Sequence, residues 1–142
     1  MTALAQDNSP LPASSQSGSQ DALALAARLL LAALFILAGV NKVGGAEGTI
    51  GYIASVGLPF PQAVFAGTVA LEIIGGLFLA VGLKTRYAAG ALGLFSIACA
   101  IVFHNDFADQ MQMTSFLKNL AIGGGMFAIA AFGPGRFALD RK

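Results

Sequence analysis

The chain has 142 residues, of which 56% are hydrophobic and only 11% are charged. A soluble domain of this size carries about a quarter charged residues, so this composition predicts a membrane protein. The net charge of +1 and the lack of a basic cluster argue against a nucleic-acid partner. Cys99 is the only cysteine, which excludes an intramolecular disulfide and a dithiol redox motif.

Four apolar segments each approach the roughly 20 residues that a helix needs to cross the hydrocarbon core of a bilayer. They predict transmembrane helices over about residues 22–42, 62–83, 87–104 and 115–132. The predicted fold class is therefore all-α, a polytopic membrane protein built as a four-transmembrane-helix bundle. Residues 22–142 form this single membrane domain. Residues 1–21, rich in Ser, Gln, Ala and Pro, are expected to be a disordered cytoplasmic tail.

The first predicted span has residues at alternating steps of four and three, which places them on one face. These residues are Arg28, Ala32, Phe35, Gly39 and Lys42. Such a face packs against neighbouring helices, while Leu, Ile and Val face lipid. Arg28 lies more than a turn inside the apolar segment. We expect its side chain to snorkel to the nearer membrane surface, with an inward orientation as the alternative. Asp21 suits the N-cap of this helix.

The segment between the first two spans is too short and too rich in glycine to cross the membrane. Ile50, Ile53 and Val56 fall near helical spacing, and Tyr52 suits a water boundary. We therefore expect a short interfacial helix here. It acts either as a structural elbow, which we favour, or as a lid over a site.

Glu72 lies near the middle of the second predicted span, where an ionised side chain is costly unless it is paired, hydrated or neutralised. It shares a helix face with Thr68, the Gly75 and Gly76 pair, and Leu79, so it points into the bundle. Two interpretations stay open. Glu72 is a functional site, or it clamps helices together through an ion pair.

The third predicted span also shows four-three spacing, along Arg86, Gly90, Gly93, Ile97, Ala100 and His104. His104 is the only histidine, and we expect it to be a surface residue at the helix end. Metal ligation by His104 would need ligands from elsewhere, so no metal site is expected. The fourth span is expected to begin at a cap on Thr114 or Ser115, and it carries Lys118 and Asn119 in its early turns.

Basic residues in the loops and tails gather at one end of the predicted bundle, at Lys84, Arg86, Arg136, Arg141 and Lys142. By the positive-inside rule both termini are then cytoplasmic. Polar residues at the opposite end predict an outward pocket with Glu72 as its floor. The candidate pocket or proton-site residues are Glu72, Lys118, His104, Lys42, Asn119, Tyr52 and Arg28. As the partner of Glu72 we favour Lys118 over Arg28, because a cation beside the carboxylate suits an outward pocket.

A series of motifs runs through the chain after the tail. They are the run from Arg28 to Phe35 with Gly39 and Lys42, Gly57-Leu58-Pro59, Glu72 with Gly75-Gly76, Gly82 to Arg86, His104, Lys118-Asn119, and Gly133 to Asp140. Together they resemble the DoxX family of small bacterial four-helix membrane proteins. The resemblance implies an inner (plasma) membrane location and an association with quinone-linked or oxidative-stress redox systems.

Three functions stay open. The favoured one is a membrane subunit or accessory protein that binds a quinone or another small apolar molecule and serves a redox partner protein. The second is a proton-coupled small-molecule carrier, which would need a homodimer to build a path. The third is a non-catalytic scaffold. With a single His, a single Cys and no nucleotide-binding glycine motif, the chain lacks two-histidine haem ligation, a dithiol and a flavin fold of its own. No covalent cofactor is therefore expected, and enzymatic activity stays open.

Overall fold

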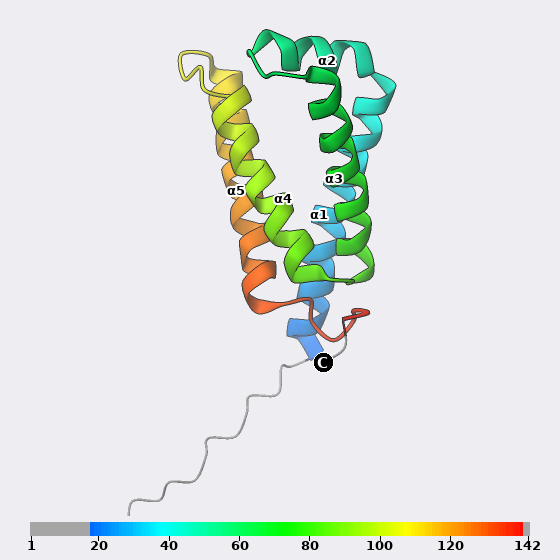
Figure 1. Ribbon diagram of the computed structural model, residues 1–142. Helices are drawn as coiled ribbons and strands as arrows, with labels where there is room; N and C mark the ends of the chain where they lie inside the picture. The colour runs from blue at the N-terminus through cyan, green and yellow to red at the C-terminus, as the bar shows by residue number, and fades with distance from the viewer. Residues whose placement is uncertain (1–17, 141–142) are drawn as a thin grey trace, which may run out of the picture.

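The computed structural model describes residues 18–140, which fold into helices without strands (Figure 1). The helices are α1 (Gly18–Gly44), α2 (Ala46–Ser55), α3 (Pro61–Val81), α4 (Thr85–Phe103) and α5 (Gln110–Phe132). All of them except α2 are long and apolar enough to cross a membrane. The predicted all-α fold with four spans is therefore confirmed. Of the predicted tail, residues 1–17 lie outside the described part of the chain.

The bundle consists of two closely packed helix pairs, α1 with α3 and α4 with α5 (Figure 1). Glycine permits each approach. A Cβ at Gly76 of α3 would lie 2.7 Å from a side-chain carbon of Ile36 on α1. A Cβ at Gly123 of α5 would lie 2.7 Å from the side chain of Ile97 on α4. Small residues at such positions bring helix backbones together in lipid.

The N-terminal boundary of the bundle lies earlier than predicted. α1 begins at Gly18, so residues 18–21 belong to the helix and Asp21 is not its N-cap. Asp21 is 2% exposed and accepts a hydrogen bond from the backbone N–H of Arg136 at 3.0 Å. This carboxylate therefore joins the start of the first helix to the end of the described chain.

The start of α5 also lies earlier than the predicted residue 115. α5 begins at Gln110, because Asp109 caps it. The Asp109 carboxylate accepts hydrogen bonds from the backbone N–H groups of Met111 and Gln112. An acidic side chain at an N-cap satisfies free donors of the first turn and suits the positive end of the helix dipole.

The predicted short helix between the first two spans is confirmed as α2, which lies across one end of the bundle (Figure 1). We call this the α2 end. The Tyr52 hydroxyl donates to the carbonyl oxygen of Phe103 at 3.0 Å, and the two rings lie 5.5 Å apart between centroids. These contacts tie α2 to α4, so α2 bridges the two helix pairs.

Residues 133–140 form a C-terminal strap that closes the opposite end of the bundle, here called the strap end (Figure 1). Asp140 accepts hydrogen bonds from the backbone N–H groups of Lys84 and Thr85, both at 2.7 Å. Its own N–H donates to the carbonyl oxygen of Gly82 at 2.8 Å. Gly82 ends α3 with a φ of 72°, a left-handed conformation that favours glycine.

Arg28 turns inward and holds this strap, so the expected snorkelling is wrong. The residue is 1% exposed. Its guanidinium donates to the carbonyl oxygens of Pro134 at 2.9 Å, Phe137 at 2.8 Å and Ala80 at 3.3 Å. Because the strap and the end of α3 bring these carbonyls to the guanidinium, the charge is solvated by the protein and does not need to reach the membrane surface.

Candidate functional site

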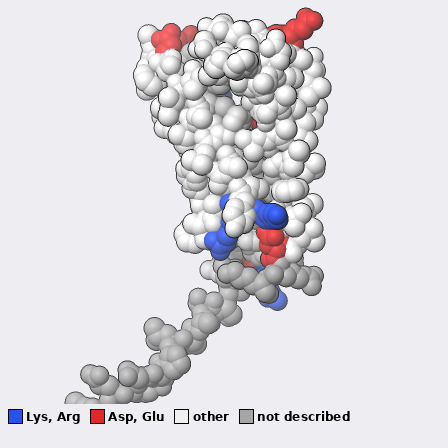
Figure 2. Space-filling view, viewed as in Figure 1, with Lys and Arg blue, Asp and Glu red and all other residues white. Residues whose placement is uncertain are grey.

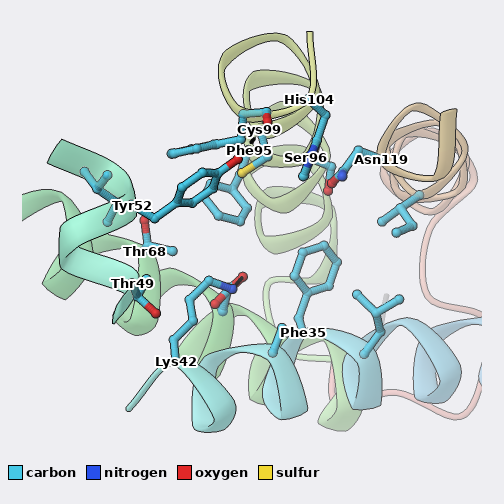
Figure 3. A pocket seen from close by; sticks show the side chains of 16 residues that line it. Phe35, Lys42, Thr49, Tyr52, Thr68, Phe95, Ser96, Cys99, His104 and Asn119 are labelled. Atoms are coloured by element: carbon cyan, nitrogen blue, oxygen red, sulfur yellow. Dashed lines mark hydrogen bonds and ion pairs between the residues drawn. The ribbon is translucent and has the colours of Figure 1, made fainter. Parts of the chain in front are cut away.

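A cavity of about 270 Å³ lies between the two helix pairs at the α2 end (Figure 3). Every helix contributes to its wall, which is mostly aliphatic and aromatic with a few polar groups. The lining residues are Leu34, Phe35, Ala38 and Lys42 from α1, Thr49, Tyr52 and Ile53 from α2, Thr68 and Glu72 from α3, Phe95, Ser96, Cys99 and Phe103 from α4 with the adjoining His104, and Asn119 and Ile122 from α5.

Lys42 and Glu72 form an ion pair in the wall of this cavity. The Lys42 Nζ lies 2.8 Å from the Glu72 Oε1. The Glu72 side chain is 4% exposed and that of Lys42 is 30% exposed. The pair links α1 to α3, and both of its residues line the cavity, Lys42 being the more exposed of the two.

This pair corrects the prediction that Glu72 is bound by Lys118, with Arg28 as the alternative. Lys118 is exposed and absent from the cavity wall. Arg28 is occupied at the strap end. Gly39 packs directly against Glu72, with a Cβ there falling 3.2 Å from the Glu72 Cβ. Lys42 follows Gly39 by about one helical turn on the same face, so its side chain reaches the carboxylate.

The second oxygen of Glu72 distinguishes this pair from a fully satisfied clamp. Glu72 Oε2 is buried and makes no hydrogen bond within residues 18–140. A carboxylate has lone pairs for several hydrogen bonds, and burying one oxygen without a donor costs free energy. The site therefore presents an acceptor with unused capacity at the edge of a cavity.

Three other polar side chains of the wall, those of Ser96, His104 and Asn119, are each held by one hydrogen bond. Ser96 Oγ donates to the carbonyl oxygen of Leu92 at 3.0 Å, and Asn119 Nδ2 donates to that of Ser115 at 3.0 Å. His104 Nδ1 lies 2.8 Å from Gln112 Oε1. These contacts fix the orientation of each side chain and leave its remaining polar atoms for a ligand.

The structure brings most of the predicted site residues together. Lys42, Tyr52, Glu72, His104 and Asn119 all line the cavity, and Figure 3 shows the labelled side chains converging from different helices. His104 is thus part of the site and not the plain surface residue that we expected. Lys118 and Arg28 lie outside the wall.

The sequence analysis missed the residues that α4 contributes, Phe95, Ser96 and Cys99. The predicted face of this helix followed Arg86, Gly90, Gly93, Ile97, Ala100 and His104, of which Gly93 and Ala100 are buried. Burial extends to a neighbouring row that includes Thr85, Ala89, Leu92 and Ser96. The hydroxyls of Thr85 and Ser96 were the signal that could have identified this row, because polar groups in a span face the protein interior.

No group of three or more His, Cys, Asp or Glu side chains gathers within the described residues in a way that could hold a metal ion. The cavity wall contains one carboxylate, one thiol and one imidazole, from Glu72, Cys99 and His104. The arrangement is suited to hydrogen bonding with a small molecule.

The sequence is similar to those of known membrane proteins. The sequence model of the DoxX family matches residues 23–105. The inner membrane protein YqjF of Escherichia coli (strain K12) is 37% identical over 122 residues, which cover 86% of this chain and 92% of that protein. The inner membrane protein YphA of the same strain is 31% identical over 125 residues, covering 84% and 89% of the two chains.

A more partial match is the "Putative oxidoreductase CatD" of Bacillus subtilis (strain 168), which is 38% identical over 76 residues, 53% of this chain and 54% of that protein. No solved structure matches the chain significantly. The region matched by the family model includes Lys42, Glu72, Cys99 and His104 but ends before α5.

Proposed function

We propose that this chain, which belongs to the DoxX family, binds a quinone or a similar small apolar molecule with a polar head group in the cavity at the α2 end. In this role it serves as a membrane subunit or accessory protein of a redox system in the bacterial inner membrane. The relatives named as inner membrane proteins support the location.

One observation carries the proposal, the Lys42–Glu72 pair in the wall of an apolar cavity. Sites for small molecules are typically concave and apolar, with a few polar groups that fix the orientation of the ligand. A pair that only clamped α1 to α3 would not need a cavity beside it. Tyr52, His104 and Asn119 supply further hydrogen-bonding groups around the same space.

The redox assignment draws on chemistry and on one relative. A quinone head group offers polar oxygens on an apolar ring, which suits a cavity of this composition. The partial match to CatD, a protein named as an oxidoreductase, supports the same class. We assign electron transfer itself to a partner protein, and we leave open whether this chain functions as a homodimer.

We further propose that both termini face the cytoplasm, which places the cavity near the periplasmic surface. Figure 2 shows Lys and Arg side chains gathered at the strap end, beside acidic side chains, and further Asp and Glu side chains exposed at the α2 end. Cytoplasmic loops carry the excess of Lys and Arg. A fluorescent protein fused after residue 142 should therefore be fluorescent, and alkaline phosphatase at the same position inactive. Active phosphatase would overturn this orientation.

A carrier and a scaffold are the weaker candidates. A carrier must expose its site alternately to both sides of the membrane. In this chain the strap end is closed by the hydrogen bonds of Arg28 and Asp140, all of which would have to break. A scaffold needs the ion pair but leaves the cavity and the free oxygen of Glu72 without a role.

Cys99 provides a direct test of ligand binding, because it lines the cavity and is the only cysteine of the chain. The protein is reconstituted in lipid nanodiscs, and the rate of Cys99 alkylation by N-ethylmaleimide is measured with increasing ubiquinone-1. This quinone has a fully substituted ring, so it does not itself alkylate the thiol. We expect saturable, several-fold protection of Cys99.

The matched control is Lys118→Met, which removes a lysine from α5 outside the cavity wall and should keep full protection. Lys42→Met should weaken the protection by removing a group that lines the cavity. Unchanged alkylation of the wild-type protein at every ubiquinone-1 concentration would contradict the proposed function.

A further inference from the structure

The unsatisfied oxygen of Glu72 carries information about the ligand. Within residues 18–140, the buried side-chain atoms without a hydrogen bond are Arg28 Nε, Glu72 Oε2 and Thr85 Oγ1. Of these three residues, only Glu72 lines the cavity. A buried acceptor at a binding site favours a ligand that brings a donor, because the ligand then removes the cost of leaving that oxygen unpaired.

Lys42 supplies the complementary group. Its ammonium has three N–H donors, and it makes one hydrogen bond, to Glu72 Oε1. The side chain lines the cavity and is 30% exposed. The ion pair therefore presents a free acceptor and free donors next to each other on one wall.

These two neighbouring groups discriminate between polar head groups. A quinone carbonyl only accepts hydrogen bonds, so it can satisfy Lys42 but leaves Glu72 Oε2 unpaired. A hydroxyl both donates and accepts, so a single phenolic O–H can satisfy the two groups together. A methyl ether loses the donor and behaves like the carbonyl.

The size of the cavity fits the head group better than a whole lipid-like molecule. Its volume of about 270 Å³ lies just below the range of roughly 300 to 1,000 Å³ that holds drug-sized ligands. Phe35, Phe95 and Ile122 give it an apolar wall suited to an aromatic ring. An isoprenoid tail would extend out of the cavity into the bilayer.

We infer that the cavity selects the reduced, hydroquinone form of its ligand, whose hydroxyl donates to Glu72 Oε2 and accepts from Lys42 Nζ. This inference rests on the proposed function and specifies the redox state that the site recognises. Glu72 is then the residue that determines specificity for the donor. Lys42 holds the carboxylate in place and binds either redox form.

The test compares three probes on the same protein in nanodiscs under argon: ubiquinone-1, ubiquinol-1 and the 1,4-dimethyl ether of ubiquinol-1. Affinities come from the concentration dependence of Cys99 protection. We expect ubiquinol-1 to bind roughly tenfold to a hundredfold more tightly than ubiquinone-1, the range of a hydrogen bond to a charged group. The dimethyl ether should bind no better than the quinone.

Glu72→Gln provides the matched variant, because the side-chain amide keeps the shape but replaces one acceptor by a donor. In this variant the affinity ratio of quinol to quinone should fall to about one or below. The series of probes on the wild-type protein keeps the inference testable even if Glu72→Gln folds poorly. A quinol preference that is lost on methylation supports the inference.

The two proposals fail in different ways. Protection by none of the probes would overturn the proposed function and this inference together. Equal affinities of ubiquinone-1 and ubiquinol-1 for the wild-type protein would leave the proposed function standing and overturn the inference. A quinol preference that survives in folded Glu72→Gln would overturn the assignment of specificity to Glu72.

Discussion

The two ends of the bundle each contain a buried charged residue that faces the protein interior. The two residues differ in their hydrogen-bond partners. At the strap end, Arg28 donates to three backbone carbonyls, and the C-terminal strap closes over it. At the α2 end, Glu72 has one partner, Lys42, and one oxygen without any within the described part of the chain. The cavity at the α2 end has Lys42 and Glu72 in its wall, whereas the hollow at the strap end, lined by Asp21, Arg86 and strap residues, does not include Arg28.

The comparison separates a structural charge from a functional one. Backbone carbonyls that belong to the fold itself accept from both terminal nitrogens of Arg28, and its Nε, which has no hydrogen bond within the described residues, does not line the cavity. Lys42 and Glu72 are satisfied only in part, and their unused hydrogen-bonding capacity lies where a small molecule can reach it. An intramembrane ionisable residue is thus better judged by its remaining capacity than by its burial alone.

The largest expected loss of stability follows from a substitution at the strap end. Arg28→Met should destabilise the protein by roughly 3 to 5 kcal/mol, because three carbonyls lose a charged donor at about 1 to 3 kcal/mol each with less than full additivity. Thermal unfolding in detergent measures the loss. The protein that remains folded should still show ligand protection of Cys99.

Arg136→Gln is the matched control for this change. The Arg136 side chain is 80% exposed, and its Nε lies 4.0 Å from Asp21. An exposed pair of this kind contributes about 0 to 1 kcal/mol. If Arg28→Met were no more destabilising than Arg136→Gln, the structural role assigned to Arg28 would be wrong.

The next effect is on the α2 end and is best measured as a double-mutant cycle. Glu72→Gln and Lys42→Met should each destabilise the protein, and the double variant should recover a coupling energy of about 1 to 3 kcal/mol. The same cycle with Lys118→Met in place of Lys42→Met should show no coupling beyond error. Coupling to Lys118 instead would contradict the geometry.

A smaller effect is expected from Asp140 and depends on pH. The backbone N–H of Thr85, then that of Lys84, and the nearby Arg28 charge hold the pKa of Asp140 below its ordinary value. A lowered pKa means that the carboxylate contributes stability above its unfolded pKa of about 3.9 and loses it as pH falls through the lower, folded value.

Asp140→Asn should therefore lower the unfolding temperature at neutral pH and reduce its fall in acid. Unfolding temperatures between about pH 3 and pH 6 check this expectation, a window that spans the unfolded pKa. Glu47→Gln, on the exposed face of α2 and remote from the strap, should leave the acid dependence in place. If the unfolding temperature of Asp140→Asn fell with pH in parallel with that of the wild type, Asp140 would not be a source of the acid dependence.

The smallest effect is expected from Tyr52→Phe, which deletes one exposed hydrogen bond to Phe103 while keeping the ring contact. The cost should be about 0.5 to 1.5 kcal/mol at most. Since this bond ties α2 over the cavity, the variant should raise the alkylation rate of Cys99 without ligand. An unchanged rate would indicate that α2 does not limit access to the cavity.

Much of the fold could be predicted from the sequence, because apolar length and four-three spacing determine which segments span and which faces meet. Phe35, Gly39 and Glu72 were all placed correctly on inward faces. The relative level of α1 and α3 could not be read in this way, since it depends on how Gly39 packs against Glu72. Because this level was unknown, Lys118 was predicted as the partner of Glu72 in place of Lys42.

The same limit explains the other differences. The inward turn of Arg28 depends on a strap more than 100 residues away in the chain, whose carbonyls no local pattern reveals. On α4, the predicted face does pack against α5 at Gly93 and Ile97, but the buried surface extends beyond it to Ser96. Local periodicity therefore predicts elements and faces, while register between helices decides which polar groups meet.

The most direct test of the central claim, that the α2 end holds a ligand-binding charge and the strap end a structural one, is native mass spectrometry. The wild type, Glu72→Gln and Arg136→Gln are extracted gently from their own membrane and compared. We predict a small lipid-soluble adduct with the mass of a quinol on the wild type and on Arg136→Gln, and its loss from Glu72→Gln. Wild-type protein without any adduct, or the same adduct retained by Glu72→Gln, would contradict the account.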